Sequence, residues 1–397
     1  MKRTSILFLI AAVALTSSLC GVFFYSPTAM VGASVSKSII VSEEDFSLET
    51  AKSELTLCSL SYDEAALEEE LTSRGYTDFM YCEKKQETNF SNGIAFGIAR
   101  CRKDSTEYIS VTFRGTKDKE WYSNFQIGEG AEHAGFSSAA DFSCKEIDSY
   151  LENLSIDKQN VIIRLTGHSR GGAVANLCAK RMSDSNCFGC VSAYTFACPN
   201  TTTADSSSAA AYKNIRNIIN PEDFICYIPL SCWGYKRYGT DFYLPTKSEK
   251  GYYDLYSSMQ DKYFENTQSA HIGYPDGDRD VSRFIEALNK ICASTHDYYN
   301  KEITLFPHSV TMYEYMQSAA AFLTSEQTMS QGMILLSSGA SPVFSPLTKF
   351  IMQGISIDSL DATDISTTAI GCAHSTDSYM AWLGILGEDY YMSKSSE

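Results

Sequence analysis

A serine with a glycine two positions away on each side lies between two segments of different character. The motif Gly-His-Ser-Arg-Gly occupies residues 167–171, with Ser169 at its centre. Residues 161–165 before it favour a buried strand, and residues 172–177 after it favour a helix of small side chains. A serine on such a tight turn has a strained backbone, while the glycines let strand and helix approach closely. The turn lifts Oγ beside the first N–H groups of the helix and predicts a nucleophilic serine; a turn without chemistry is the alternative.

A nucleophilic serine needs a histidine and an acid to activate it. Asp223, next to Glu222, follows the strand predicted at residues 215–219, at the edge where open α/β sheets keep their active sites. A serine on a strand-to-helix elbow is followed in the chain first by the acid and then by the histidine. That order sets aside His133 and His168, and four candidate histidines remain, namely His271, His296, His308 and His374.

Segments with strand and helix character alternate around these residues. Runs rich in β-branched and aromatic residues predict strands at 94–99, 108–113, 161–166, 191–196 and 215–219. Apolar spacing predicts helices at 48–74, 142–154 and 171–182, and residues 233–244 suggest an aromatic hairpin around Gly239. Alternation of this kind is typical of the α/β class. We therefore expect a mostly parallel central sheet with helices on both faces, followed by a C-terminal elaboration.

Further motifs occur in a fixed order along the chain. They are Val-Thr-Phe-Arg-Gly-Thr at 111–116, Trp121, His-Ala-Gly-Phe at 133–136, Thr-Phe-Ala-Cys-Pro-Asn at 195–200, Asn-Pro-Glu-Asp-Phe-Ile-Cys-Tyr-Ile-Pro at 220–229 and Arg-Tyr-Gly at 237–239. Together with the serine motif, they resemble the class 3 lipases, the fungal-lipase-like branch of the α/β hydrolases. Ala197 stands where that family has glycine, and Cys226 where it has the first proline.

The resemblance implies roles for the acid and the base. It puts the acid three residues after an asparagine, at Asp223 rather than Glu222. It favours His374 as the base, because a helix-forming stretch that carries a tyrosine follows this histidine. His308 has a similar setting, and His271 fits the shorter spacing of compact members, so both stay as alternatives.

The resemblance also implies how the reaction would proceed. Thr116 would donate its N–H, and its hydroxyl as a second possibility, to an oxyanion, and Arg170 would donate its backbone N–H. Ser169 would form an acyl-enzyme, with no cofactor and no metal. The predicted function is hydrolysis of acyl esters, of lipids by family resemblance, as in triacylglycerol lipases. The alternatives are an exported pseudoenzyme or binding protein, and a serine hydrolase that acts on amides, thioesters or the acyl esters of polysaccharides.

The composition of the chain limits the classes of partner that the protein is expected to bind. The formal net charge of −16 argues against nucleic acid, which calls for clustered lysine and arginine. Transient contact with a neutral lipid interface is compatible with this charge, and the oligomeric state stays open. Cys187 and Cys190 form a lone Cys-x-x-Cys, and the acidic run at 276–280 lacks the glycine and glutamate of an EF-hand loop. We expect no metal at either place.

The N-terminus indicates export. Lys2 and Arg3 precede an apolar run at 6–15, the pattern of a secretory signal. We predict a signal peptide at 1–33, a linker at 34–47 and a hydrolase domain at 48–397 with an insertion at about 246–365. The protein would then be secreted. If the signal is not cleaved, the apolar stretch at 6–25 is long enough to anchor the chain in a membrane.

Overall fold

The computed structural model describes the following residues of the chain: 46–85, 93–117, 124, 127–128, 130–207, 212–273, 281–282, 285–286, 289, 302–305, 308–311, 367–387 and 390. The predicted signal peptide at 1–33, the linker up to residue 45 and most of the predicted insertion lie outside them. None of the described helices is both long and apolar enough to cross a bilayer.

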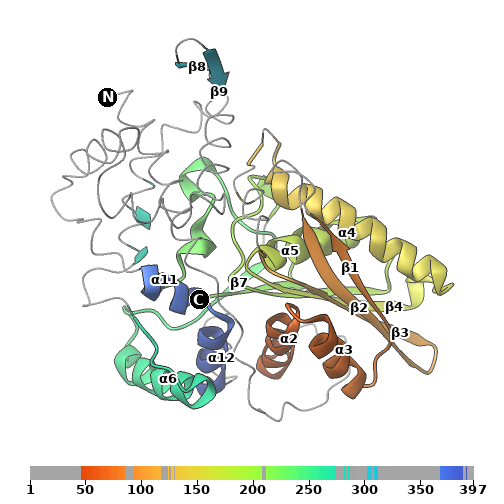
Figure 1. The fold of residues 1–397 in the computed structure, drawn as a ribbon, viewed down its shortest axis with the longest axis horizontal. Helices are drawn as coiled ribbons and strands as arrows, with labels where there is room; N and C mark the ends of the chain where they lie inside the picture. Colours follow the sequence, from red (N-terminus) through yellow and green to blue (C-terminus); the bar gives the residue numbers. More distant parts are fainter. Residues whose placement is uncertain are drawn as a thin grey trace.

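A seven-stranded sheet runs through the centre of the described structure, and its strands are ordered as in the chain (Figure 1). They are β1 (Thr77–Lys84), β2 (Ile94–Lys103), β3 (Thr106–Phe113), β4 (Val161–His168), β5 (Cys190–Phe196), β6 (Ile215–Ile219) and β7 (Thr240–Tyr243). The pairs β1–β2 and β2–β3 are antiparallel, and every later pair is parallel. The mostly parallel sheet confirms the predicted fold class.

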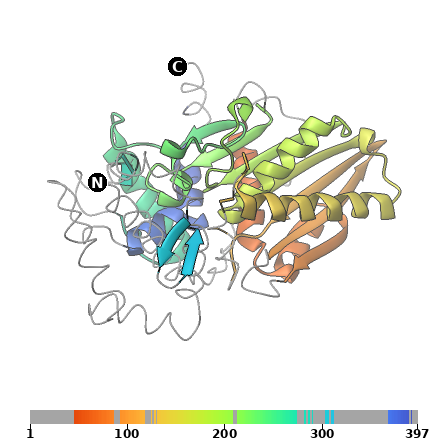
Figure 2. The same ribbon diagram turned by 90° about the horizontal axis from the view of Figure 1, so that it is seen from above.

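Helices cover both faces of this sheet (Figures 1 and 2). One face carries α4 (Ala134–Asn153) and α5 (Arg170–Ser185), whose apolar side chains pack with those of β2–β5 in one buried cluster. The other face carries α2 (Leu48–Leu60), α3 (Glu64–Ser73) and α12 (Thr376–Ile385). A second cluster joins α2 and α12 to β5, β6 and α6 (Tyr252–Thr267). The sheet is thus buried on both sides, as parallel sheets require.

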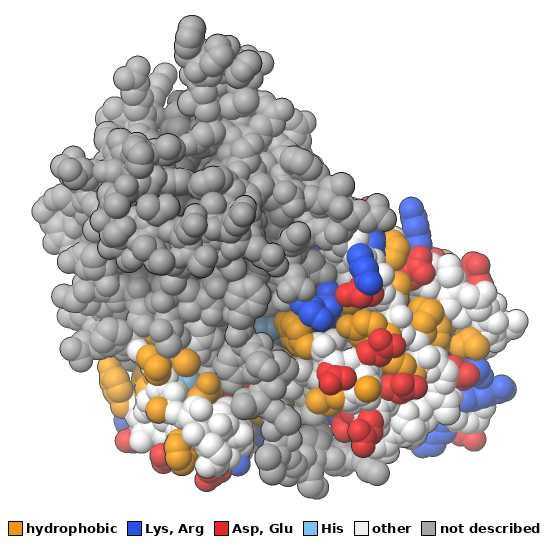
Figure 3. All heavy atoms as spheres, in the orientation of Figure 1, with side chains coloured by type: hydrophobic (Ala, Val, Ile, Leu, Met, Phe, Trp, Pro, Cys, Tyr) orange, Lys and Arg blue, Asp and Glu red, His pale blue; other side chains and the backbone are white. Residues whose placement is uncertain are grey.

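The remaining elements are short. They are α11 (Thr367–His374), the antiparallel pair β8 (Glu302–Leu305) and β9 (His308–Thr311), and the 3-10 helices η2 (Lys158–Asn160), η3 (Asp205–Ser207), η4 (Phe224–Tyr227) and η5 (Ser231–Trp233). The described cysteines are free thiols, Cys187 and Cys190 included. Over the half of the molecule that carries α4, acidic, basic and apolar side chains are interspersed on the face seen in Figure 3.

Two local predictions were wrong. The helix expected at 48–74 is broken into α2 and α3, because Asp63 accepts hydrogen bonds from Ala65 N at 3.0 Å and Ala66 N at 3.1 Å and so starts a new helix. The hairpin expected at 233–244 does not form. Its second half is β7, which pairs in parallel with β6, while Lys236 in its first half bridges to Thr202.

Candidate active site

Ser169 occupies a strained elbow between β4 and α5. Its backbone angles are φ 58° and ψ −128°, outside the regions that L-residues normally adopt. The strain is held by hydrogen bonds on both sides, from Ser169 N to the Phe196 carbonyl at 2.9 Å and from Ala173 N to the Ser169 carbonyl at 3.1 Å. Ser169 is the N-cap of α5, so its Oγ lies at the helix end where N–H groups lack intrahelical acceptors.

The glycines of the motif are required by close backbone approach. A Cβ on Gly167 would overlap the backbone of Gly171, and a Cβ on Gly171 would overlap the carbonyl of Phe113. The first contact joins β4 to α5, and the second joins α5 to β3. Larger residues at either position would therefore push the elbow away from the sheet.

A chain of hydrogen bonds links the serine to the histidine and the acid favoured from the sequence. His374 Nε2 lies 2.9 Å from Ser169 Oγ, and His374 Nδ1 lies 2.8 Å from Asp223 Oδ2. The three side chains are buried, with Asp223 fully inaccessible. Because a carboxylate only accepts hydrogen bonds, Nδ1 carries the proton and Nε2 offers its lone pair to the serine hydroxyl.

Asp223 is held by three donors. Tyr379 donates its hydroxyl to Oδ2 at 2.9 Å, and Ile225 donates its backbone N–H to Oδ1 at 3.0 Å, in addition to the bond from His374. The Tyr379 hydroxyl in turn accepts from Asn220 N at 3.0 Å. This tyrosine lies on α12, five residues after His374, so one short segment supplies both the candidate base and a hydrogen-bond donor to the candidate acid.

Of the other acid and base candidates, Glu222 and His271 have other partners. Glu222 forms an ion pair with Lys247 at 3.6 Å. His271 lies after α6, with its Nδ1 3.3 Å from the Tyr256 hydroxyl, and His308 begins β9. His296 is outside the described residues.

The proposed oxyanion donors lie together at the elbow. Gly115, just before Thr116, approaches the backbone carbonyl of His168 so closely that a Cβ there would lie 3.2 Å from it. Asn124 bridges the two donor residues, because its Nδ2 donates to Thr116 Oγ1 at 3.1 Å and its Oδ1 lies 3.5 Å from Arg170 Nη1. Having accepted this bond, the Thr116 hydroxyl keeps its own proton to donate. No sequence pattern pointed to Asn124.

His168 has a role that the sequence did not suggest. Its Nε2 donates to the backbone carbonyl of His374 at 2.7 Å, and the two rings are 4.8 Å apart. His168 therefore holds the backbone of His374 in place, although 206 positions separate them. A motif search explains His168 by its place in the elbow and cannot reveal this contact.

Metal-ligating side chains are scattered in the described part of the chain. His, Cys, Asp and Glu form no group of three there that could hold a metal ion. The acidic run at 276–280 and Trp121 both lie outside the described residues.

The fold and the elbow define an α/β hydrolase with a serine at the nucleophile position. Within that class, residues 102–232 match the family model described as Lipase (class 3). The matched segment spans β3 to η5 and includes Ser169 and Asp223. It confirms, over this segment, the resemblance seen in the motifs and supports a lipase-like ester hydrolase.

Comparison with solved structures adds fungal lipases at low identity. The chain is similar to a mono- and diacylglycerol lipase from Aspergillus oryzae, with 17% identity and a TM-score of 0.41 over 52% of this chain and 82% of that one. A lipase from Rhizopus microsporus var. chinensis is 14% identical, with a TM-score of 0.38 over 54% of this chain and 82% of that one. The Rhizomucor miehei lipase in its propeptide complex is 15% identical, with a TM-score of 0.37 over 56% of this chain and 83% of that one. Comparison with curated proteins gives no match.

Two buried histidines beside the site make stability depend on pH. Burial lowers the pKa of His133 and that of His168 from 6.5 to about 3 in the folded protein. Between pH 6.5 and pH 3 the unfolded chain binds more protons than the folded protein does. The contribution of these histidines to stability is therefore fully present above pH 6.5 and is lost as the pH falls toward 3. We expect the free energy of unfolding to drop by up to about 1.4 kcal/mol per pH unit for each histidine. Urea unfolding at pH 7, 6 and 5 measures this slope.

The variant His133→Asn tests the source of the slope. His133 caps α4 by accepting from Phe136 N, a role that asparagine can take over. The variant should be less stable at pH 7, because the ring of His133 stacks on Phe136 at 4.0 Å, and its slope with pH should be shallower. An unchanged slope would show that His133 does not contribute to the pH dependence of stability.

Tyr379→Phe should slow catalysis while the substrate still binds. The change removes the hydroxyl that donates to Asp223 and leaves the N–H of Asn220 without its acceptor. We expect kcat to fall roughly tenfold with KM unchanged, because about 1.4 kcal/mol lost from the transition state corresponds to that factor. The free energy of unfolding should fall by about 1–3 kcal/mol. Tyr390→Phe, which loses a hydrogen bond to Glu249, is the matched control. An unchanged kcat in Tyr379→Phe would show that the Tyr379 hydroxyl does not support catalysis.

Proposed function

We propose that the protein is a secreted serine ester hydrolase that cleaves acyl esters, lipids first among them, through Ser169, His374 and Asp223. The observation that carries this proposal is the unbroken hydrogen-bond chain from Ser169 Oγ through His374 to Asp223, set on the nucleophile elbow. A binding protein would not need to keep a buried acid, base and hydroxyl in this order.

In the first half-reaction Ser169 Oγ attacks the ester carbonyl carbon while its proton passes to His374 Nε2. Asp223 holds the tautomer and stabilises the imidazolium that forms. The tetrahedral oxyanion is bound by the backbone N–H groups of Thr116 and Arg170. As it collapses, the carbon–oxygen bond to the alcohol breaks, and His374 returns the proton to the leaving oxygen.

In the second half-reaction water hydrolyses the acyl-enzyme. His374 takes a proton from the water, whose oxygen adds to the acyl carbon. His374 then donates this proton to Ser169 Oγ as the acid departs. Both steps build negative charge at one carbonyl oxygen. A single pair of donors therefore serves both transition states, and each donor is worth about 3 kcal/mol.

The substrate assignment is tested by hydrolysis of p-nitrophenyl esters of graded chain length. A lipase should cleave esters of medium and long acyl chains, and a serine-directed fluorophosphonate should label the protein at Ser169. Amide and thioester analogues with the same acyl group form the comparison series. Failure to label, or cleavage of the amide alone, would overturn the proposal.

Export is proposed from the N-terminal sequence alone. Lys2, Arg3 and the apolar run at 6–15 predict a signal peptide that is cleaved after Ala33. N-terminal sequencing of the protein from the culture medium should begin at Ser34. Recovery of the intact chain in the membrane fraction would instead support an anchor at 6–25.

A further inference from the structure

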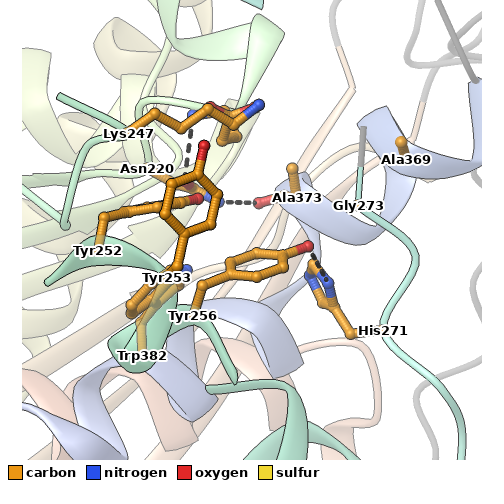
Figure 4. A pocket seen from close by; sticks show the side chains of 11 residues that line it. Asn220, Lys247, Tyr252, Tyr253, Tyr256, His271, Gly273, Ala369, Ala373 and Trp382 are labelled. Atoms are coloured by element: carbon orange, nitrogen blue, oxygen red, sulfur yellow. Dashed lines mark hydrogen bonds and ion pairs between the residues drawn. The ribbon is translucent and has the colours of Figure 1, made fainter. Parts of the chain in front are cut away.

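A cavity of about 220 Å³ lies beside the segment that leads into His374 (Figure 4). Its walls come from α6, α11 and α12 and from the residues that follow β6, β7 and α6. Asn220 and Ala373 form one side, where Asn220 Nδ2 donates to the Ala373 carbonyl at 2.9 Å. The cavity is therefore a neighbour of the hydrolytic site with its own lining.

Aromatic rings make up much of the lining of this cavity. Tyr252, Tyr253 and Tyr256 come from the first two turns of α6, and Trp382 comes from α12. Tyr252 and Tyr256 are stacked with ring centroids 5.6 Å apart, and the Tyr256 hydroxyl points to His271 in Figure 4. Tyr253 is 66% exposed, so its ring is available without disturbing the core. Such a wall suits a ligand with a flat, apolar C–H face.

The charges of the lining balance. Glu222 and Lys247 are its charged residues, and they lie 3.6 Å apart as an ion pair. Burial lowers the pKa of His271 to about 4, so this ring is neutral at neutral pH. A charged ligand would gain no net attraction here, and an acyl chain would leave the carboxylate and the ammonium group against hydrocarbon.

We propose that this cavity binds a neutral sugar ring. A pyranose presents C–H groups on a face, which suits the exposed ring of Tyr253, and neighbouring hydroxyls at its edge. Those hydroxyls can donate to Glu222 and accept from Lys247 at the same time, since the pair offers an acceptor and a donor side by side. The volume of about 220 Å³ suits one such ring.

The test is calorimetric titration of the full chain carrying Ser169→Ala, so that no turnover interferes and the outcome does not depend on the proposed esterase function. The probes are the methyl glycosides of glucose, galactose and mannose, with phosphocholine and hexanoate as charged comparisons. At least one glycoside should bind with millimolar affinity. Tyr253→Ala should weaken that binding roughly two- to tenfold, and Glu222→Gln about tenfold.

Phe264→Ala is the matched control, because Phe264 is an exposed ring on the same helix outside the cavity. It should leave the affinity unchanged. The proposal is overturned if no glycoside binds or if neither Tyr253→Ala nor Glu222→Gln changes the affinity. It is also overturned if phosphocholine or hexanoate binds in the cavity more tightly than every glycoside. Binding of a glycoside by a protein that hydrolyses no ester would leave this proposal standing while the esterase proposal fails.

Discussion

Ester hydrolysis by the Ser169→Ala variant is expected to show a kcat lower than that of the wild type by roughly 10⁴- to 10⁶-fold. The reason is that Ser169 Oγ is the atom that forms the acyl bond, and it lies 2.9 Å from His374 Nε2. The oxyanion donors stay in place, so a weak residual rate above that of water should remain. Initial rates on a p-nitrophenyl ester and fluorophosphonate labelling measure the loss.

The control for this variant is Ser185→Ala. Ser185 is exposed at the other end of α5, so its replacement tests the helix without touching the elbow. It should retain normal rates and labelling. If Ser169→Ala still labels, or still turns over at a rate near that of the wild type, the nucleophile is another residue.

His374→Ala should cost a similar factor, roughly 10⁴- to 10⁶-fold in kcat, because it removes the only base within reach of Ser169 Oγ among the described residues. His308→Ala should retain rates close to those of the wild type, because His308 belongs to the separate β8–β9 pair. Measuring both variants on the same ester gives a direct comparison.

The two histidine variants also check each other. His374→Ala must be shown to fold, by a thermal melt, before its loss of activity is assigned to chemistry. An active His374→Ala beside an inactive His308→Ala would reverse the assignment of the base. Loss of activity in both would indicate that the β8–β9 pair supports the site.

Buried strands were the part of the fold that sequence could predict. The strand expected at 215–219 is β6, and those at 108–113, 161–166 and 191–196 differ from β3, β4 and β5 by one or two residues at an end. A strand covered on both faces needs an apolar side chain at nearly every position, and this composition is visible without neighbours.

Elements that depend on their neighbours were missed or shortened. The edge strand β1 has a partly exposed, mixed sequence and is a strand because it pairs with β2. The helix expected at 142–154 begins eight residues earlier, at Ala134, where His133 accepts from Phe136 N. Likewise, β7 became a parallel partner of β6 through pairing that no local pattern encodes.

By itself the sequence determined the elbow at Ser169, because a strand, two glycines and a helix of small residues are local features with one steric solution. Motif order then favoured Asp223 and His374 but left His308 and His271 open, since a separation of 151 residues says nothing about distance. Only the tertiary structure brings His374 to 2.9 Å from Ser169 Oγ and adds His168, Asn124 and Tyr379 around the site. These contacts join segments far apart in the chain, and they exist only once packing on both faces of the sheet has brought those segments together.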